Sequence, residues 1–358
     1  MKRVLVTTLL ALGVFACDKE ETAQKEPAAS AQAALTGAAP STVTAAAPSA
    51  KRAGKAGLAT AHLAASCEVL ARVDVAALLA LPAIKKEIVP ALEEMKAKEP
   101  KDDSGKRFKA FLTEAGIDPL KDVSELALCI TDLAGAMPGA ATRKEPGVTL
   151  LLAASVKPGA LVPALLKHGK ADKVSETEIG GVKAVTDPKG EMFAGQAADG
   201  VILVAKGKGD FEAALKAGDA AGKLGLPLEE PIAFAIPGAT MQTLMKQAGQ
   251  QNPFAAQVDK VGRAALTADL VKNTLAVRID MADEKAAMEL AGALKMILGQ
   301  LSKGPAQAGP MGMAGNALKD AKVDAIGKEL VAELAIPAAQ IEALTKQLAE
   351  SIRKGELR

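Results

Sequence analysis

The residues with the most distinctive chemistry in this sequence are three cysteines, in a chain that has only two histidines and neither tyrosine nor tryptophan. A cysteine thiolate can act as a nucleophile, bind a soft metal or join a second thiol in a disulfide. Cys17 ends an apolar stretch near the N-terminus, whereas Cys67 and Cys129 lie in segments that alternate like β-strands. This placement predicts a covalent modification at Cys17 and a structural role for the other two cysteines.

Cys67 and Cys129 are candidates for a disulfide if the chain leaves the cytosol. Closing a loop of this length stabilises a fold by up to about 4–5 kcal/mol in the chain-entropy model, and often by less. The alternative is a pair of buried free thiols that pack as small apolar side chains. Sequence alone does not place the two Cα atoms within bridging distance, so both interpretations stay open, and we predict one intramolecular disulfide.

The two histidines offer little support for catalysis. His62 lies at the start of the body, and His168 follows a predicted helix over 158–167, where a histidine commonly interacts with the helix dipole. The chain has no GxSxG, Walker or HExxH motif and no CxxC pair, so we predict no catalytic, cofactor-binding or metal-binding residues. The segment from Gly207 to Asp210 precedes a predicted helix and is interpreted as a turn with a cap rather than an anion site.

The first 16 residues have the three parts of a secretory signal peptide. Lys2 and Arg3 form a positive start, residues 4–15 form a short apolar run, and the small residue Ala16 precedes Cys17. The run is too short for a spanning helix, which needs about 20 apolar residues. These features predict export of the chain.

The segment Val14-Phe15-Ala16-Cys17 resembles the lipobox of bacterial lipoprotein signal peptides, although Phe15 is bulkier than the usual residue there. The resemblance implies cleavage before Cys17, a diacylglycerol thioether on its sulfur, and acylation of the new amine by a chain such as palmitate. A lipid on Cys17 would hold the protein at a membrane of the bacterial cell envelope, with the body in the periplasm or at the surface. The alternatives are an ordinary secretory signal followed by a chance cysteine, and a short N-terminal anchor.

Residues 17–61 are predicted to be a disordered tether behind the lipidated cysteine. The segment is rich in alanine, lysine and proline and has no aromatic residue, so it offers too little apolar area to offset chain entropy. A flexible chain of this length spans roughly 35–40 Å. It would hold the body away from the bilayer, or simply separate the signal from the fold.

The sequence of the body predicts an α+β fold with mixed or antiparallel sheets and packed helices. The Asp199-Gly200 pair is a strong hairpin signal, and short strands around it suggest a meander over 173–205. Other strands are predicted over 67–73, 123–130, 147–156, 231–236, 264–271, 274–281, 322–326 and 329–335, and helices over 158–167, 210–217, 239–249 and 254–261 and after Asp283 and Pro337.

The order of these elements occurs twice, which predicts two tandem α+β halves over 62–225 and 226–358. The clearest matches are residues 149–166 with 274–294, and residues 199–215 with 327–344. Residue identity between the halves is poor, so the prediction depends on element order alone.

Composition excludes several classes of function. With aromatics at 2% and a net charge of +2, the chain lacks the rings for stacking sugars or single-stranded nucleic acid and the charge of a DNA-binding protein. We therefore expect a non-catalytic envelope lipoprotein of binding or scaffolding function, with the membrane and an envelope protein as partners. The alternatives are a periplasmic carrier of an apolar ligand such as lipid and, more remotely, a hydrolase that uses carboxylates.

Overall fold

The fold is taken from a computed structural model that describes residues 57–98, 100, 103–136, 145–157, 159–169, 174–218, 220–247, 255–301 and 321–355. The signal peptide, Cys17 and residues 17–56 of the predicted tether lie outside the described residues.

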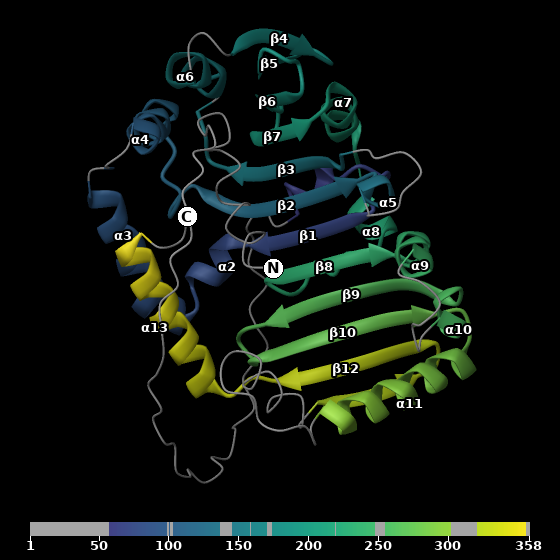
Figure 1. The fold of residues 1–358 in the computed structure, drawn as a ribbon. Helices are drawn as coiled ribbons and strands as arrows, with labels where there is room; N and C mark the ends of the chain where they lie inside the picture. The colour runs from purple at the N-terminus through teal and green to yellow at the C-terminus, as the bar shows by residue number, and fades with distance from the viewer. Residues whose placement is uncertain are drawn as a thin grey trace, which may run out of the picture.

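The body is built on one twelve-stranded sheet in the order β11-β12-β10-β9-β8-β1-β2-β3-β7-β6-β5-β4 (Figure 1). Every neighbouring pair of strands is antiparallel. The strands are β1 (Val69–Asp74), β2 (Val123–Thr131), β3 (Gly147–Ala154), β4 (Ser175–Ile179), β5 (Val182–Thr186), β6 (Met192–Gln196), β7 (Val201–Lys206), β8 (Ile232–Pro237), β9 (Val261–Asp269), β10 (Thr274–Met281), β11 (Lys322–Ile326) and β12 (Glu329–Ala335). The predicted α+β fold is confirmed in its antiparallel form.

Helices fill the connections between the strands. They are η2 (Thr60–His62), α2 (Val75–Leu79), η3 (Ile84–Ile88), α3 (Val89–Ala97), α4 (Asp103–Ala115), α5 (Leu133–Ala136), α6 (Leu161–His168), α7 (Lys208–Lys216), α8 (Ala220–Lys223), α9 (Gly238–Gln247), α10 (Ala255–Val258), α11 (Glu284–Leu301) and α13 (Ala338–Lys354).

Local signals explain several of the element boundaries. Asp74 and Asp283 accept hydrogen bonds from the amides of Ala77 and Ala286 and so cap α2 and α11. Gly200 has a φ of 93° in the turn between β6 and β7, where a side chain would be strained. The predicted helix over 254–261 is wrong at its end, because Val261 pairs with Met281 and begins β9.

The strands form two series that run outward from the central β1–β8 pair. Read outward from the central β1–β8 pair, the first half runs β1-β2-β3-β7 and the second half runs β8-β9-β10-β12. The matched segments β3–α6 and β10–α11 therefore occupy equivalent positions, as do β7 and β12. The two halves share one sheet rather than forming separate sheets.

The sheet has two faces, which we name by the helix that covers each in the first half. The α7 face carries Leu70, Cys129 and Leu151, and the α6 face carries Leu150 and the residues in register with it. In Figure 1, α7 lies on one side of the first-half strands, and α4 and α6 lie on the other side. Two separate clusters of buried apolar residues fill these layers.

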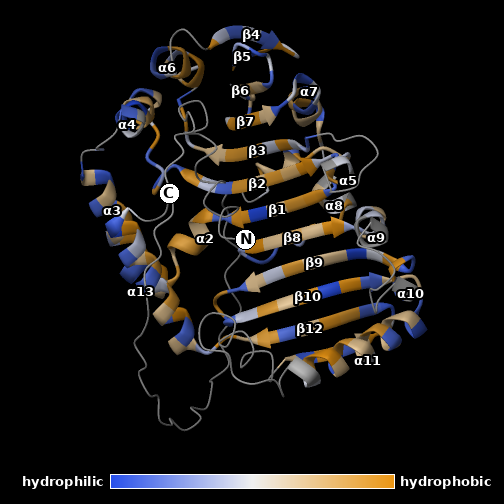
Figure 2. Ribbon diagram, in the orientation of Figure 1, coloured by the Kyte–Doolittle hydropathy of each residue, from blue (hydrophilic) through white to orange (hydrophobic). Residues whose placement is uncertain are grey.

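In the second half, the α6 face is again apolar and is covered by α11. Cross-strand partners share a face, and the register from Phe234 through Leu266 and Val277 to Ala332 places all four residues on this face. The α7 face of the same strands carries ion pairs, with Arg263 2.7 Å from Asp280 and Arg278 3.3 Å from Glu329. Figure 2 shows the resulting alternation of hydrophobic and hydrophilic residues along β10 and β12.

A buried ion pair lies near the junction of the halves. Arg72 Nε donates to Glu125 Oε1 at 2.7 Å, and both side chains are 2% exposed. Arg72 also donates to the carbonyl oxygens of Leu228 and Glu230 in the connection to β8. Further bonds of this kind are what a buried charged pair needs to offset desolvation.

The described chain begins inside the predicted tether. Residues 57–61, which we assigned to the tether, pack on the α7 face, and Ala59 is fully buried. Its amide donates to Glu125 Oε2 at 2.9 Å. The folded body therefore starts before residue 62. Composition could not predict this start, because the bonding partner Glu125 is distant in sequence.

Candidate functional site

Cys67 and Cys129 form a disulfide, with their Cα atoms 5.3 Å apart. Cys67 precedes β1 and Cys129 lies in β2, so the bond joins the chain at the entrance of the body to the middle of the sheet. Both residues are 3% exposed and belong to the core of the α7 face. Of the two arrangements that the sequence leaves open for these residues, the structure contains the bonded one.

The two histidines lie apart, and each is bonded to a carboxylate. His168 ends α6, as its sequence position suggests, and its Nε2 lies 2.7 Å from Glu114 Oε2. Hydrogen bonds from Lys167 and His168 hold the pKa of Glu114 below its usual range. His62 lies on η2 and bonds to Asp199 at 2.8 Å.

The predicted turn before α7 contains a partly buried carboxyl group. Gly207 has a φ of 96° at the start of the helix. Burial, together with the nearby Asp132 carboxylate, raises the pKa of Asp210, while a hydrogen bond with Thr131 opposes the shift. Negative charge here opposes the binding of a phosphate, in keeping with the predicted turn. The predicted cap is wrong, because Gly207 is the N-cap residue and no side chain caps the start of α7.

The described residues show no candidate metal site. No group of three or more histidine, cysteine, aspartate or glutamate side chains in that part of the chain could hold a metal ion.

A cavity of about 390 Å³ lies on the α6 face of the second half, between the sheet and α11. Its size falls within the range of about 300–1,000 Å³ that is usual for small-molecule sites. The lining residues are Met241, Gln257, Val258, Val261, Ala264, Leu266, Leu275, Val277, Ile279, Leu290, Leu294, Leu298, Ala321, Ala332, Glu333 and Leu334. All but two have apolar side chains.

The cavity has a sheet floor and a helical wall. The floor includes three alternate residues of β10, which share one side of the sheet because successive strand residues face opposite sides. They are Leu275, Val277 and Ile279. Leu290, Leu294 and Leu298 follow one another at four-residue spacing and form the wall along α11. Both patterns arise from local periodicity, but only the fold sets them facing each other.

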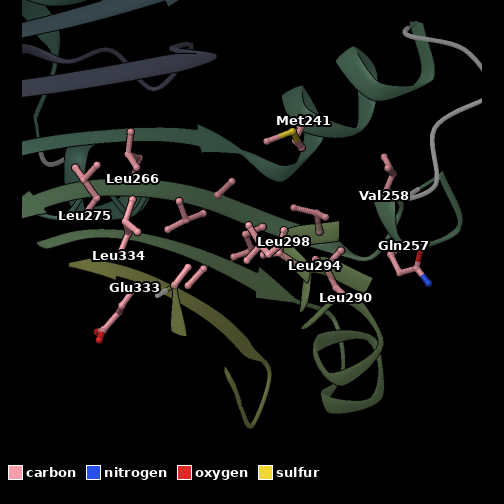
Figure 3. A pocket seen from close by; sticks show the side chains of 16 residues that line it. Met241, Gln257, Val258, Leu266, Leu275, Leu290, Leu294, Leu298, Glu333 and Leu334 are labelled. Carbon is pink, nitrogen blue, oxygen red and sulfur yellow. The ribbon is translucent and has the colours of Figure 1, made fainter. Parts of the chain in front are cut away.

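The two polar lining residues, Gln257 and Glu333, do not direct their polar groups into the cavity. In the close-up of Figure 3, the carboxylate of Glu333 and the amide of Gln257 point away from the cluster of leucine side chains. At the sheet side, Leu266 is 41% exposed, which is unusual for a leucine on an apolar sheet face. The site offers hydrocarbon contact without a built polar anchor, so it suits an apolar chain better than a polar metabolite.

From the sequence we predicted no ligand-binding residue in this cavity. A carrier of an apolar ligand was only an alternative there, and periodicity does not show which apolar face is left open. The available signal was the leucine spacing on the helix after Asp283, together with the alternation over 274–281.

Comparison with known proteins gives a distant structural likeness. Crystal forms I, III and IV of the protein TP0453 match at 13%, 12% and 11% sequence identity, with TM-scores of 0.35, 0.38 and 0.38. The matches cover 79–82% of this chain and 93–97% of that protein. No family model matches the chain, and no curated protein matches it either. Within the described part of the chain, no helix is both long and apolar enough to cross a bilayer.

Proposed function

We propose that this protein is a lipid-anchored, non-catalytic protein of the bacterial cell envelope that binds one apolar ligand, such as a lipid acyl chain. The cavity between α11 and the second half of the sheet carries this proposal. Its lining gives a hydrocarbon chain a favourable transfer from water of about 25 cal/mol per Å² of buried apolar area. Its lack of an inward polar group argues against selection by a charged or hydrogen-bonding group.

The anchor part of the proposal depends on Cys17 and the lipobox that precedes it. The test is to compare the wild type with Cys17→Ser by membrane fractionation and intact-mass measurement. We expect wild type in the membrane fraction with the added mass of a diacylglyceryl group and a further acyl chain, and the variant without either. Wild-type protein with an unmodified Cys17 would overturn the anchor.

The ligand part can be tested separately with the full-length Cys17→Ser chain and the fluorescent fatty acid cis-parinaric acid. We expect saturable binding that weakens by about tenfold or more in Ala332→Phe, because the ring occupies the cavity. Ala276→Phe is the matched control, since Ala276 lies on the neighbouring strand and faces the opposite side of the sheet. Absence of binding, or equal weakening in both variants, would contradict the proposal.

Scaffolding of another envelope protein is the second candidate. It is favoured by Leu344 and Leu348, two exposed leucines on α13. Crosslinking in intact cells with the wild type and with Leu344→Glu/Leu348→Glu tests it. Loss of one specific adduct in the variant is the supporting result, and an unchanged pattern is the opposing one.

A further inference from the structure

The cavity between α11 and the sheet has a closed end and an open end. At the closed end, the lining residues Val258 and Val261 are 5% and 8% exposed, and Leu290 in the first half of α11 is 7% exposed. Toward the opposite end, in the direction of the turn between β9 and β10, the lining residue Leu266 is 41% exposed. A ligand therefore enters beside Leu266 and stops where the buried residues begin.

The wall and the floor of the cavity both run between these two ends. Along α11, the wall extends over eight residues from Leu290 to Leu298, which is about 12 Å at 1.5 Å per residue. Along β10, the floor extends over four residues from Ile279 to Leu275, which is about 14 Å at 3.4 Å per residue. Figure 3 shows Leu290 on the side of Val258 and Leu298 on the side of Leu275.

The two lengths agree, and together they set the depth of the cavity. A carbon–carbon bond of about 1.5 Å with a bond angle near 111° advances an extended chain by about 1.25 Å per carbon. A depth of about 12–14 Å therefore accommodates about ten carbons of one extended hydrocarbon chain.

The open end provides no partner for a polar head group among the described lining residues. Leu275 and Leu334 are cross-strand partners there and both line the cavity. Glu333 is the charged lining residue, but its cross-strand partners Ala276 and Lys322 place it on the α7 face of the sheet. A head group at this end is therefore left in water.

The direction of entry follows from the same lining. An amphiphile that entered with its polar end first would bury a polar or charged group without a hydrogen-bond partner, which is costly. Entry with the methyl end first buries hydrocarbon at the closed end and leaves the polar group hydrated at the open end.

We propose that the cavity is a blind-ended channel that takes one acyl chain with its methyl end first, holds about ten carbons, and does not select the head group. This inference rests on the proposed binding of an apolar ligand and adds to it a chain length and a direction. Carbons beyond about the tenth extend past Leu266 and contribute little to affinity.

Displacement of cis-parinaric acid from the full-length Cys17→Ser chain tests the channel. The competitors are straight-chain fatty acids of six to sixteen carbons and their methyl esters. Affinity should rise about fourfold with each added methylene up to about ten carbons and should then stay level. At ten carbons and above, acid and ester should bind within about twofold of each other, because the head group stays in water.

Variants at the two ends sharpen the test. Val258→Phe extends about 3 Å further into the closed end, so the affinity should level off at about seven or eight carbons. Ala276→Phe, on the opposite face of the sheet, is the matched control and should keep the wild-type limit. Leu266→Lys places a cation at the open end and should favour acid over ester by about threefold.

The outcomes separate this inference from the proposed function. If no competitor and no probe binds, both are wrong. If the competitors bind but affinity still rises about fourfold per methylene beyond about twelve carbons, or acid and ester differ by more than about threefold in the wild type, the channel alone is wrong. An unchanged limit in folded Val258→Phe also contradicts it. If Val258→Phe does not fold, the wild-type series and Leu266→Lys still decide the question.

Discussion

The two halves of the sheet have strands in the same order but are covered in different ways. In the first half, α7 packs on one face and α4 with α6 on the other, and both layers are solid core. In the second half, α11 covers the α6 face and leaves a cavity, while ion pairs occupy the opposite face. Strand order fixes where each residue lies, and the helices decide whether a face becomes filled core or encloses a cavity.

The segment between the first two strands of each half accounts for much of this difference. In the first half it includes α4, whose Phe108 and Phe111 pack in the same cluster as Leu165 of α6. In the second half, the corresponding segment contributes Met241 of α9 and Val258 of α10 to the cavity wall. These aliphatic side chains fill less volume than phenyl rings, which leaves the cavity open.

The largest predicted contrast concerns charge. Glu125→Ala in the first half should lower the free energy of unfolding by up to about 3–5 kcal/mol, because it removes the buried carboxylate that bonds to both Arg72 and the Ala59 amide. The carboxylate that Arg72 then keeps is that of Asp74, which is more exposed and lies 3.5 Å away. Glu329→Ala, which removes the exposed partner of Arg278, should cost about 0–1 kcal/mol. Urea unfolding of both variants measures the contrast, and similar losses would erase this distinction between the halves.

The disulfide gives the next largest effect. Replacing Cys67 and Cys129 together by serine should cost about 2–4 kcal/mol, since the unfolded chain regains the freedom of the closed loop. Hydrogen exchange by strand sharpens the comparison: β1–β3 should lose more protection than β10 and β12. An equal loss along the sheet would mean that the two halves unfold as a single unit.

Added volume should distinguish the cavity from the core. Ala194→Leu in the packed first half should destabilise the fold by about 1–3 kcal/mol through overpacking. Ala332→Leu faces the cavity, so its cost should be below about 0.5 kcal/mol. Thermal unfolding of both variants supplies the measurement, and an equal cost would indicate that the cavity is already filled by side-chain movement.

The smallest predicted effects concern two carboxylates with opposite pKa shifts. The pKa of Asp210 is raised by burial and by Asp132, so its ionised form is disfavoured in the fold. Its stabilising contribution is present below the unfolded pKa of about 3.9 and is lost as the pH rises through the folded pKa. Asp210→Asn should therefore gain up to about 0.5 kcal/mol at pH 7 and nothing at pH 3.

Asp269 in the second half is the counterpart. Burial opposes ionisation there, but bonds from Lys272 and from the Val271 amide outweigh burial and lower the pKa. Its contribution is present above the unfolded pKa and is lost as the pH falls through the folded pKa. Asp269→Asn should lose stability at pH 7 but not at pH 3, and unfolding curves at both pH values check the two signs.

Much of the fold is determined by local patterns in the sequence. Alternation over 274–281 matches β10 in full, and the Gly180-Gly181 pair, with φ values of 59° and 79°, gives the turn between β4 and β5. Asp74 and Asp283 cap the starts of α2 and α11, and prolines stand at the starts of α3 and α13. These signals operate over a few residues, so they can be interpreted before any long-range contact is known.

Tertiary structure alone decided which of these elements meet. The bond between Cys67 and Cys129, the burial of Ala59 against Glu125, and the cavity between α11 and β10 each join residues far apart in sequence or depend on how a helix packs. The leucines at 290, 294 and 298 give α11 an apolar side, but periodicity does not state whether that side meets a filled core or an open space. That outcome depends on the volume contributed by other segments, which no local pattern contains.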